Sequence, residues 1–302
     1  LQEKIDDAKI VEFIHTLQNE KHAIRIVPPN QAHKIRCNQP DRIMSSRFVI
    51  TEKKEDNSSR IKARWCLRGH HDPDLVEEVL SGKCHSPTLS QLGRSIILQL
   101  IVSFGWSLNL GDIKGAFLEA DVSQQTSTKP VFAELPPGGV PGVAAGSLVQ
   151  VLGNIYGAND TPHNWYVEFD SVARQAGFTR SKLDSCLYFC HGDDGQLQGV
   201  LGAHVDDTIT GGCGDKCSAA IEMLKSRFPF RKWRTGEGEF LGTVYKQLDN
   251  GEIVFHQKEY AEHIRPISIA KERVKKPWLS ATDKEIPALR AVNGALGWIS
   301  SQ

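Results

Sequence analysis

The amino-acid sequence, 302 residues long, predicts an α+β fold whose sheet is largely antiparallel. Two segments, 90–105 and 161–177, repeat apolar residues at helical spacing. Other segments alternate apolar and polar residues and are joined by turn sequences such as Asp249-Asn-Gly251. Because helices and hairpins do not alternate strictly along the chain, the pattern favours α+β over a parallel α/β sheet.

The composition is that of a packed globular chain, with 40% hydrophobic and 24% charged residues. Lys+Arg and Asp+Glu both total 36, so any nucleic-acid surface must come from local segregation of charge. No apolar run is long enough to span a membrane and no secretory signal is visible, so we expect an intracellular protein that is not secreted and has no membrane partner.

The seven cysteines are an odd number, which favours free thiols in a reducing compartment over a disulfide framework. The pairs Cys186/Cys190 and Cys213/Cys217 are spaced more widely than the Cys-x-x-Cys of a zinc ribbon, so we expect idle or buried thiols. The chain begins without methionine and stops inside a helical pattern, so we expect a piece cut from a longer polypeptide.

The first predicted elements lie within 1–28, as a helix followed by a short strand at 23–27. The helix has five candidate core residues, Ile5, Val11, Phe13, Ile14 and Leu17. A hairpin follows, with strands at 47–51 and 60–67 around the polar loop 52–59.

The second strand of this hairpin carries a cationic face, because Arg60, Lys62 and Arg64 alternate with apolar residues. The basic run continues with Arg68, His70 and His71. A cationic face suits a polyanion, and an ordinary solvated face is the alternative.

The helix predicted at 90–105 is buried, with Ser90 as its N-cap, and the helix at 161–177 begins with Thr161 as N-cap. The other predicted elements are strands at 106–113, 131–135, 187–190 and 199–205, a helix at 217–228, a hairpin of 240–248 with 252–256, and helices at 258–264 and 287–301.

Two adjacent acids, Asp206 and Asp207, follow the strand 199–205 in a turn, and a third acid, Asp112, ends the strand 106–113. Acids are poor strand formers, so a divalent cation is a good reason for them, and a solvated turn or unrelated surface acids are the alternatives. On neighbouring strands the three carboxylates would repel one another, and a pair of Mg2+ ions would remove that penalty. Two such ions can activate a 3′-hydroxyl and stabilise a leaving pyrophosphate.

Nine motifs, in one order, resemble those of copia-type retrotransposon reverse transcriptases. Asp112-Ile-Lys-Gly-Ala-Phe-Leu118 resembles the first catalytic motif, and His204-Val-Asp-Asp207 resembles Tyr-Val-Asp-Asp. The others are Lys62-Ala-Arg-Trp-Cys-Leu-Arg-Gly69, Ser86-Pro-Thr88, Phe132-Ala-Glu-Leu-Pro-Pro-Gly138, Ile155-Tyr-Gly157 with Trp165-Tyr166, Asp184-Ser-Cys-Leu-Tyr188, Phe240-Leu-Gly242 and Leu289-Arg-Ala-Val-Asn-Gly-Ala-Leu-Gly297. The likeness covers roughly residues 40–302.

The resemblance implies a right-hand polymerase fold with fingers, a palm of antiparallel sheet flanked by helices, and a partial thumb or connection. The implied ranges are 1–39 for an N-terminal helical leader, 40–105 for fingers, 106–212 for palm with an inserted part of the fingers, and 213–302 for thumb or the start of the connection. In the family this part lies in a Pol polyprotein, between an integrase and an RNase H that serve DNA integration and transposition.

The activity implied by the resemblance is RNA-directed DNA polymerisation, in which two Mg2+ ions, or Mn2+ in their place, assist transfer of a dNTP to a primer 3′-hydroxyl. Asp112, Asp206 and Asp207 match the catalytic metal ligands, together with the backbone carbonyl of Ile113. Phe117 matches the aromatic residue under the incoming sugar, where its ring would exclude a 2′-hydroxyl.

Other matches concern the dNTP and the template with its primer. Lys62 and Arg64 match cations that hold the triphosphate, and Ile113 lies beside the same substrate. The residues expected near an RNA template and its DNA or tRNA primer are Tyr156, Gly157, Lys225, Arg227, Arg231, Lys232 and Arg234. Loop packing for the first two, and a solvated helix end for the rest, are the alternatives.

Two departures from the family pattern stand out. Ala158-Asn159-Asp160 replaces Leu-Lys-Gln, and His204 replaces tyrosine. We expect Asp160 to cap the helix at 161–177 instead of contacting substrate. The departures keep a second hypothesis open, a non-catalytic nucleic-acid-binding relic, while a thiol or metal-binding scaffold is a third. The resemblance places the protein in a cytoplasmic virus-like particle or the nucleus.

Overall fold

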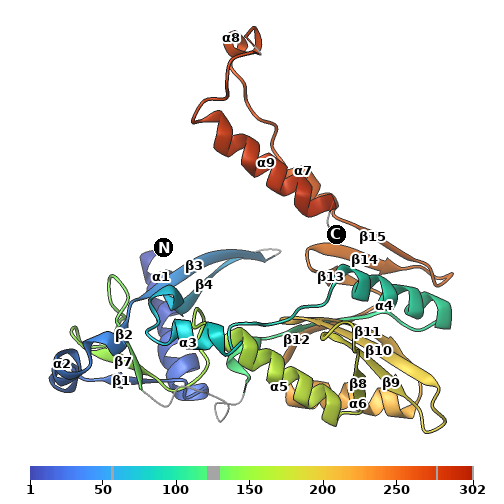
Figure 1. The fold of residues 1–302 in the computed structure, drawn as a ribbon, viewed down its shortest axis with the longest axis horizontal. Helices are drawn as coiled ribbons and strands as arrows, with labels where there is room; N and C mark the ends of the chain where they lie inside the picture. Colours follow the sequence, from blue (N-terminus) through green and yellow to red (C-terminus); the bar gives the residue numbers. More distant parts are fainter. Residues whose placement is uncertain (56–57, 121–129, 277, 301–302) are drawn as a thin grey trace. The chain divides into compact units, whose positions relative to one another are not determined.

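A computed structural model describes residues 1–55, 58–120, 130–276 and 278–300, and the chain divides into two compact units (Figure 1). Unit 1 contains Leu1–Pro87 and Lys114–Gln175, and unit 2 contains Thr88–Ile113 and Ala176–Gln302. Each unit is therefore assembled from two separate stretches of chain.

Unit 1 combines helices, a four-stranded sheet and a separate hairpin. Its helical segments are α1 (Gln2–Ile10), the π-helix Val11–Glu20, α2 (Pro29–Asn38), α3 (Leu75–Leu80), α5 (Thr161–Gln175) and short 3-10 turns at Pro40–Arg42, Gly69–His71 and Ala116–Leu118. The sheet has the order β1 (Ile24–Val27), β7 (Leu148–Val151), β6 (Val131–Glu134) and β2 (Ile43–Met44), and only its last pair is parallel. The hairpin consists of β3 (Ser46–Glu55) and β4 (Ser58–Leu67).

The core of unit 1 joins the π-helix to the hairpin. Phe13 and Leu17 are fully buried in the same cluster as Trp65 of β4, and the rings of Phe13 and Trp65 meet edge to face at 5.3 Å. Trp65 Nε1 donates to Ser46 Oγ at 3.0 Å. Two of the predicted core residues are thus confirmed, whereas Val11 is 48% exposed because it lies two residues from Phe13, on the other side of the helix.

Unit 2 is built on a six-stranded antiparallel sheet. Its strand order is β12 (Phe230–Thr235), β5 (Asn109–Ile113), β11 (Asp207–Gly212), β10 (Leu197–His204), β9 (Leu187–His191) and β8 (Phe178–Arg180). Two helices, α4 (Gln91–Phe104) and α6 (Asp215–Arg227), cover its opposite faces (Figure 1). Gly202 lies under Ile97 of α4, whereas Gly199, three residues earlier, lies under Cys217 of α6, as the alternation of a strand requires.

Helix α4 has the predicted ends but not the predicted burial. Ser90 Oγ accepts the N–H of Gly93 as an N-cap, and Gly105 ends the helix with a left-handed φ of 64°. Ile97 and Ile101 are buried against the sheet, but Leu92 is 71% exposed. The helix is therefore amphipathic: it is buried along one face only, and among the predicted apolar residues Leu92 and Phe104 are exposed.

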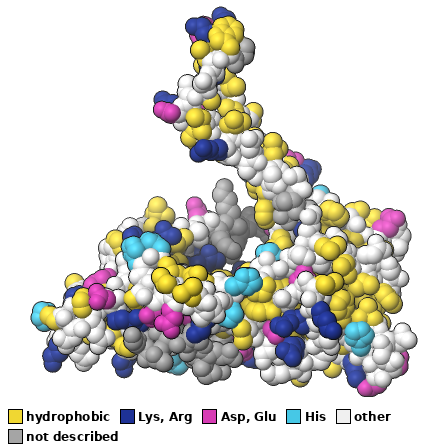
Figure 2. Space-filling view, viewed as in Figure 1, with side chains coloured by type: hydrophobic (Ala, Val, Ile, Leu, Met, Phe, Trp, Pro, Cys, Tyr) yellow, Lys and Arg dark blue, Asp and Glu magenta, His cyan; other side chains and the backbone are white. Residues whose placement is uncertain are grey.

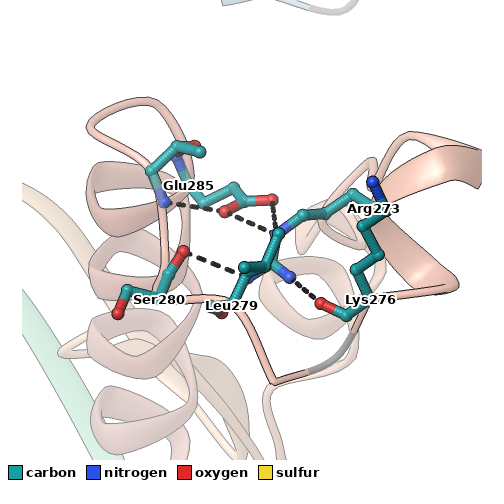
Figure 3. Close-up of polar contacts among 6 residues, drawn as sticks. Arg273, Lys276, Leu279, Ser280 and Glu285 are labelled. Carbon is teal, nitrogen blue, oxygen red and sulfur yellow. Dashed lines mark hydrogen bonds and ion pairs between the residues drawn. The ribbon is translucent and has the colours of Figure 1, made fainter.

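The C-terminal part of unit 2 contains a second sheet and three helices. These elements are β13 (Glu237–Phe240), β14 (Thr243–Gln247), β15 (Ile253–His256), α7 (Lys258–His263), α8 (Lys271–Val274) and α9 (Glu285–Ser300). Figure 3 shows the side chain of Arg273, a residue of α8, joining the following loop to the start of α9: its Nε donates to Glu285 Oε1 at 3.1 Å and its Nη2 to the Leu279 carbonyl at 2.6 Å. Glu285 and Thr282 also exchange hydrogen bonds in a capping box at the start of α9.

The α+β class is confirmed, and the predicted helices and hairpins are found with shifted ends. The strands of the first hairpin extend into the predicted loop 52–59, of which residues 56–57 lie outside the described part, as does Ser301 of the last predicted helix. Strand β13 was not predicted. Within the described ranges, no helix is long and apolar enough to cross a membrane.

The two units and the ranges expected for fingers, palm and thumb divide the chain at different residues, and the division into fingers, palm and thumb stays a prediction. Helix α4, expected with the fingers, packs on the sheet of unit 2, and α5, expected with the palm, belongs to unit 1. The segment 1–39, expected as an N-terminal helical leader, supplies part of the unit 1 core. Helical periodicity shows which face of a helix is buried but not which element covers it.

Candidate functional site

Three carboxylates that are far apart in sequence converge at one end of the unit 2 sheet. Asp207, the first residue of β11, lies directly opposite Asp112 of β5 in the antiparallel register. Side chains of opposed residues share one face of a sheet. Asp206 occupies the turn before β11, and its backbone carbonyl accepts the N–H of Ile113 at 2.8 Å. The strand pairing thus holds the three residues side by side.

The turn that carries Asp206 has an unusual backbone. His204 pairs with Asp207, which leaves Val205 and Asp206 as a two-residue turn. Val205 has a φ of 57°, a left-handed conformation that is rare for a β-branched residue. Leu241, in the turn between β13 and β14, has a φ of 52°, and its backbone N–H donates to the Asp207 carboxylate. Backbone strain of this kind collects at functional sites.

The electrostatics of this end of the sheet favour a cation. Burial first, and then the charges of Asp206 and Asp112, raise the pKa of Asp207 to about 7, and Glu239 acts in the same direction. Arg231 of β12 partly offsets this charge, because its Nη1 lies 3.4 Å from Asp112 Oδ2. The negative charge is therefore crowded and only partly compensated.

Hard carboxylate oxygens are the donors that Mg2+ prefers, so the chemistry of this set fits a divalent ion. Across the described residues, however, no three His, Cys, Asp or Glu side chains are arranged to hold a metal. Arg231 Nη1 lies within ion-pair distance of Asp112 Oδ2 in this arrangement.

His204, at the position of the expected tyrosine, is half-buried at the end of β10, directly before the turn. Burial lowers its pKa, while a hydrogen bond that it donates to the Leu89 backbone carbonyl and the charge of Asp206 act in the opposite direction. Its Nδ1 is buried and finds no hydrogen-bond partner among the described residues. The replacement leaves the pairing of Asp207 with Asp112 intact.

In unit 1, three of the predicted substrate and template residues form a series of contacts. The guanidinium of Arg64 lies 5.7 Å from the ring centre of Tyr156, and the ring of Phe117 meets that of Tyr156 edge to face at 6.1 Å. Arg64 Nε is buried and has no hydrogen-bond partner within the described part of the chain. A buried donor of this kind calls for an acceptor that a ligand can provide.

Gly157 and its neighbours are fixed to the end of β4. The φ of Gly157 is 85°, and a Cβ there would collide with the Leu67 carbonyl oxygen. Leu67 N–H donates to the Tyr156 carbonyl at 2.8 Å, and Asn159 Nδ2 donates to the Gly69 carbonyl at 2.9 Å. The close packing of this loop against β4 is therefore enough to explain why residue 157 is a glycine.

Asp160 lies at the start of α5, where its carboxylate and its backbone carbonyl both bind Asn164. Its carboxylate accepts from Asn164 Nδ2 at 3.2 Å, while its backbone carbonyl accepts Asn164 N–H at 2.9 Å. Thr161, the predicted N-cap, accepts the N–H of Ile155 through Oγ1 at 3.2 Å. Both residues lie at the start of α5, and their capping roles stay predictions.

The predicted basic cluster is divided between a helix end and a strand. Lys225 and Arg227 end α6, whereas Arg231, Lys232 and Arg234 belong to β12, where Lys232 lies opposite Asp112. Lys225 Nζ lies 4.3 Å from the ring centre of Trp233, an aromatic partner on β12. On the face drawn in Figure 2, lysine and arginine side chains lie in several separate places among acidic and apolar side chains.

Sequence patterns did not mark Leu241 or Glu239 as neighbours of Asp207, nor Arg231 as a partner of Asp112. The motif Phe240-Leu-Gly242 drew attention to this segment, but it did not indicate that Leu241 contacts Asp207.

The family model described as "Reverse transcriptase (RNA-dependent DNA polymerase)" matches residues 33–271. The chain is 25% identical over 242 residues to the "Retrovirus-related Pol polyprotein from transposon RE1" of Arabidopsis thaliana, covering 79% of this chain and 15% of that protein. It is 22% identical over 284 residues to the "Retrovirus-related Pol polyprotein from transposon TNT 1-94" of Nicotiana tabacum, covering 93% of this chain and 19% of that protein. The chain thus spans less than one fifth of either relative.

Among solved structures, a foamy viral protease-reverse transcriptase in complex with double-stranded DNA is similar with a TM-score of 0.39 and 11% identity, covering 83% of this chain and 36% of that one. A telomerase from Candida albicans has a TM-score of 0.42 and 9% identity, covering 82% and 48%.

Proposed function

Since the chain belongs to the reverse transcriptase (RNA-dependent DNA polymerase) family, we propose that it is the RNA-directed DNA polymerase part of a copia-type retrotransposon Pol polyprotein. The reaction joins a dNTP to a primer 3′-hydroxyl and releases pyrophosphate. The observation that carries the proposal is the strand pairing of Asp207 with Asp112, with Asp206 in the adjoining turn.

The proposed metal ligands are Asp112, Asp206 and Asp207, with the backbone carbonyl of Ile113, for two Mg2+ ions or Mn2+. Bound there, the ions supply activation of the 3′-hydroxyl and charge stabilisation for the pyrophosphate. The protein supplies the ligands on a rigid support, since the Ile113 N–H to Asp206 carbonyl bond ties the turn to β5. When Arg231 moves away from Asp112, the Asp112 carboxylate is free to bind a metal ion.

The dNTP is proposed to meet residues of unit 1. Lys62 and Arg64 hold the triphosphate, and the unpartnered Nε of Arg64 supports this because phosphate oxygens are the acceptors it lacks. Phe117 is half-buried against Tyr156, and its remaining ring surface is proposed to exclude the 2′-hydroxyl of a ribonucleotide.

The template and primer are proposed to follow Tyr156, Gly157 and the basic cluster. The contact of Lys225 with Trp233 supports this, because cations beside aromatic rings suit a nucleic-acid strand. The further proposed partners are an RNA template, a DNA or tRNA primer, and the integrase and RNase H of the same polyprotein, in a cytoplasmic virus-like particle or the nucleus. The departures at His204 and Asp160 leave the carboxylates in place, so no observation favours the non-catalytic alternative.

Primer extension on an RNA template with dNTPs and Mg2+ tests the proposal. We expect the wild type to extend the primer and Asp206→Asn to lose at least about 100-fold in rate, the loss typical for one essential electrostatic group. Asp160→Asn is the matched control and should retain the rate, because its carboxylate binds Asn164. A folded wild type without extension, or an Asp206→Asn variant as active as the wild type, would show the proposal to be wrong.

A further inference from the structure

The ring of Tyr156 contacts two residues that are proposed to bind different parts of the dNTP. Arg64 Cζ lies 5.7 Å from the centre of this ring. The ring of Phe117 meets it edge to face, with centres 6.1 Å apart and planes at 66°. Both distances lie within the range of attractive cation–π and aromatic contacts. One ring therefore connects the proposed triphosphate cation to the aromatic residue proposed to exclude a ribose 2′-hydroxyl.

The backbone of Tyr156 is held in unit 1 by contacts that do not involve its ring. Its carbonyl accepts the N–H of Leu67, the last residue of β4, at 2.8 Å. The preceding residue, Ile155, is fully buried, and its N–H donates to Thr161 Oγ1 at 3.2 Å. Because these bonds hold the main chain, a change of the Tyr156 side chain should remove the ring contacts and leave the loop attached to β4.

Each partner of the Tyr156 ring keeps a part that a substrate can bind. Arg64 Nε is buried and has no hydrogen-bond partner among the described residues. Phe117 lies in the 3-10 turn Ala116–Leu118, where Ala116 is only 5% exposed, but Phe117 itself is half-buried. Side chains that bind a ligand lose rotamer freedom, and a contact that restricts them beforehand lowers this cost. The Tyr156 ring can supply this restriction to both partners.

We propose that Tyr156 is a positioning residue that couples the two ends of the dNTP site, because its ring restricts the side chains of Arg64 and Phe117 together. This role rests on the proposed polymerase function and deepens it. Affinity for the triphosphate and exclusion of ribonucleotides then depend on the same ring, and Tyr156 acts on the dNTP through its two partners.

Steady-state kinetics with a dNTP and with the matching ribonucleotide, on one primer and template, test this role. Tyr156→Leu removes the ring, so we expect the KM for dNTP to rise about five-fold. The preference for dNTP, taken as the ratio of the two kcat/KM values, should fall by about five-fold as well. Tyr156→Phe keeps the ring and should restore both values to within about two-fold of the wild type. Tyr260→Leu, a control that removes a 39% exposed tyrosine of α7, should change neither.

A change at one end of the series separates coupling from a local effect. Arg64→Gln alters the triphosphate end, yet it should lower the preference for dNTP over ribonucleotide about two- to three-fold, because Phe117 loses support through Tyr156. In a Tyr156→Leu background the same change should leave this preference unaltered. Melting curves show whether each variant is folded, and the comparison of Arg64→Gln with the wild type decides the question even where Tyr156→Leu does not fold.

A folded Tyr156→Leu variant in which only one of the two quantities changes overturns the coupling while the wild type still extends primers. An Arg64→Gln variant with an unchanged preference for dNTP does the same. A wild type that extends no primer overturns the proposed function itself.

Discussion

Each unit contains a cluster of acids in which one carboxyl holds its proton far above the usual range. In unit 2 burial and two neighbouring carboxylates raise the pKa of Asp207 to about 7. In unit 1 burial and the charges of Asp72 and Asp160 raise the pKa of Glu78 to about 7 as well. On pKa alone the two clusters are equivalent candidates for a functional site.

Their surroundings differ. The unit 2 acids lie on paired strands and a strained turn, where Asp112 faces Asp207. The unit 1 acids are partly engaged with the protein: Asp74 accepts two bonds from Arg42 at 2.7 Å, and Glu78 accepts a bond from the Asn159 side chain, although Glu78 Oε2 has no hydrogen-bond partner among the described residues. A raised pKa therefore reports crowding, whereas a rigid, incompletely compensated set of oxygens indicates a site.

The comparison predicts that Mg2+ stabilises the protein through unit 2 alone, and this is the largest expected effect. At a Mg2+ concentration about 100 times its dissociation constant, the wild type should gain about 2.7 kcal/mol, seen as a melting temperature several degrees higher. Asp112→Asn should lose this gain, and Glu78→Gln should keep it. Loss of the gain in Glu78→Gln would mean that the unit 1 cluster is the metal site.

A smaller effect is expected from the two arginines that face these clusters. Arg231→Gln removes the cation beside Asp112, so an incoming ion no longer displaces it, and Mg2+ should bind about three- to ten-fold more tightly, equivalent to about 1 kcal/mol. Arg42→Gln should leave Mg2+ affinity unchanged and lower the unfolding free energy by about 1 kcal/mol, because Asp74 loses its partner. Titrations of Mg2+ followed by melting temperature measure both, and equal affinities in Arg231→Gln and wild type would argue against the competition.

Much of the unit 2 site could be predicted from the sequence because local patterns place it. The acids at 112 and 206–207 follow apolar strand patterns, and only neighbouring strands can bring them together. The structure adds what local patterns cannot specify, namely long-range pairing. Arg231 meets Asp112 through the pairing of β12 with β5, and Leu241 meets Asp207 through a strand, β13, that was not predicted.

The unit 1 residues proposed to bind the dNTP were less predictable for a related reason. Lys62 and Arg64 are visible on an alternating strand, but no local pattern shows that Arg64 contacts Tyr156 or that Tyr156 contacts Phe117. These three residues come from segments that are far apart in the chain, and local periodicity does not pair such segments.

The two clusters should also differ in how pH affects stability. Glu78 has a folded pKa of about 7 against its usual 4.5, so the folded state binds its proton more tightly than the unfolded state. Stability from this group is full below pH about 4.5 and declines as pH rises to about 7. The melting temperature of Glu78→Gln should therefore exceed that of the wild type by more at pH 8 than at pH 4.

Asp207 should also lower the stability of the folded state as pH rises over a similar range. Saturating Mg2+ should remove this loss of stability, because the bound ion favours the ionised carboxylate. Melting curves at several pH values, with and without Mg2+, separate the two contributions. If Mg2+ abolished the pH dependence that remains in Asp207→Asn, Glu78 would be a metal ligand and the contrast between the clusters would fail.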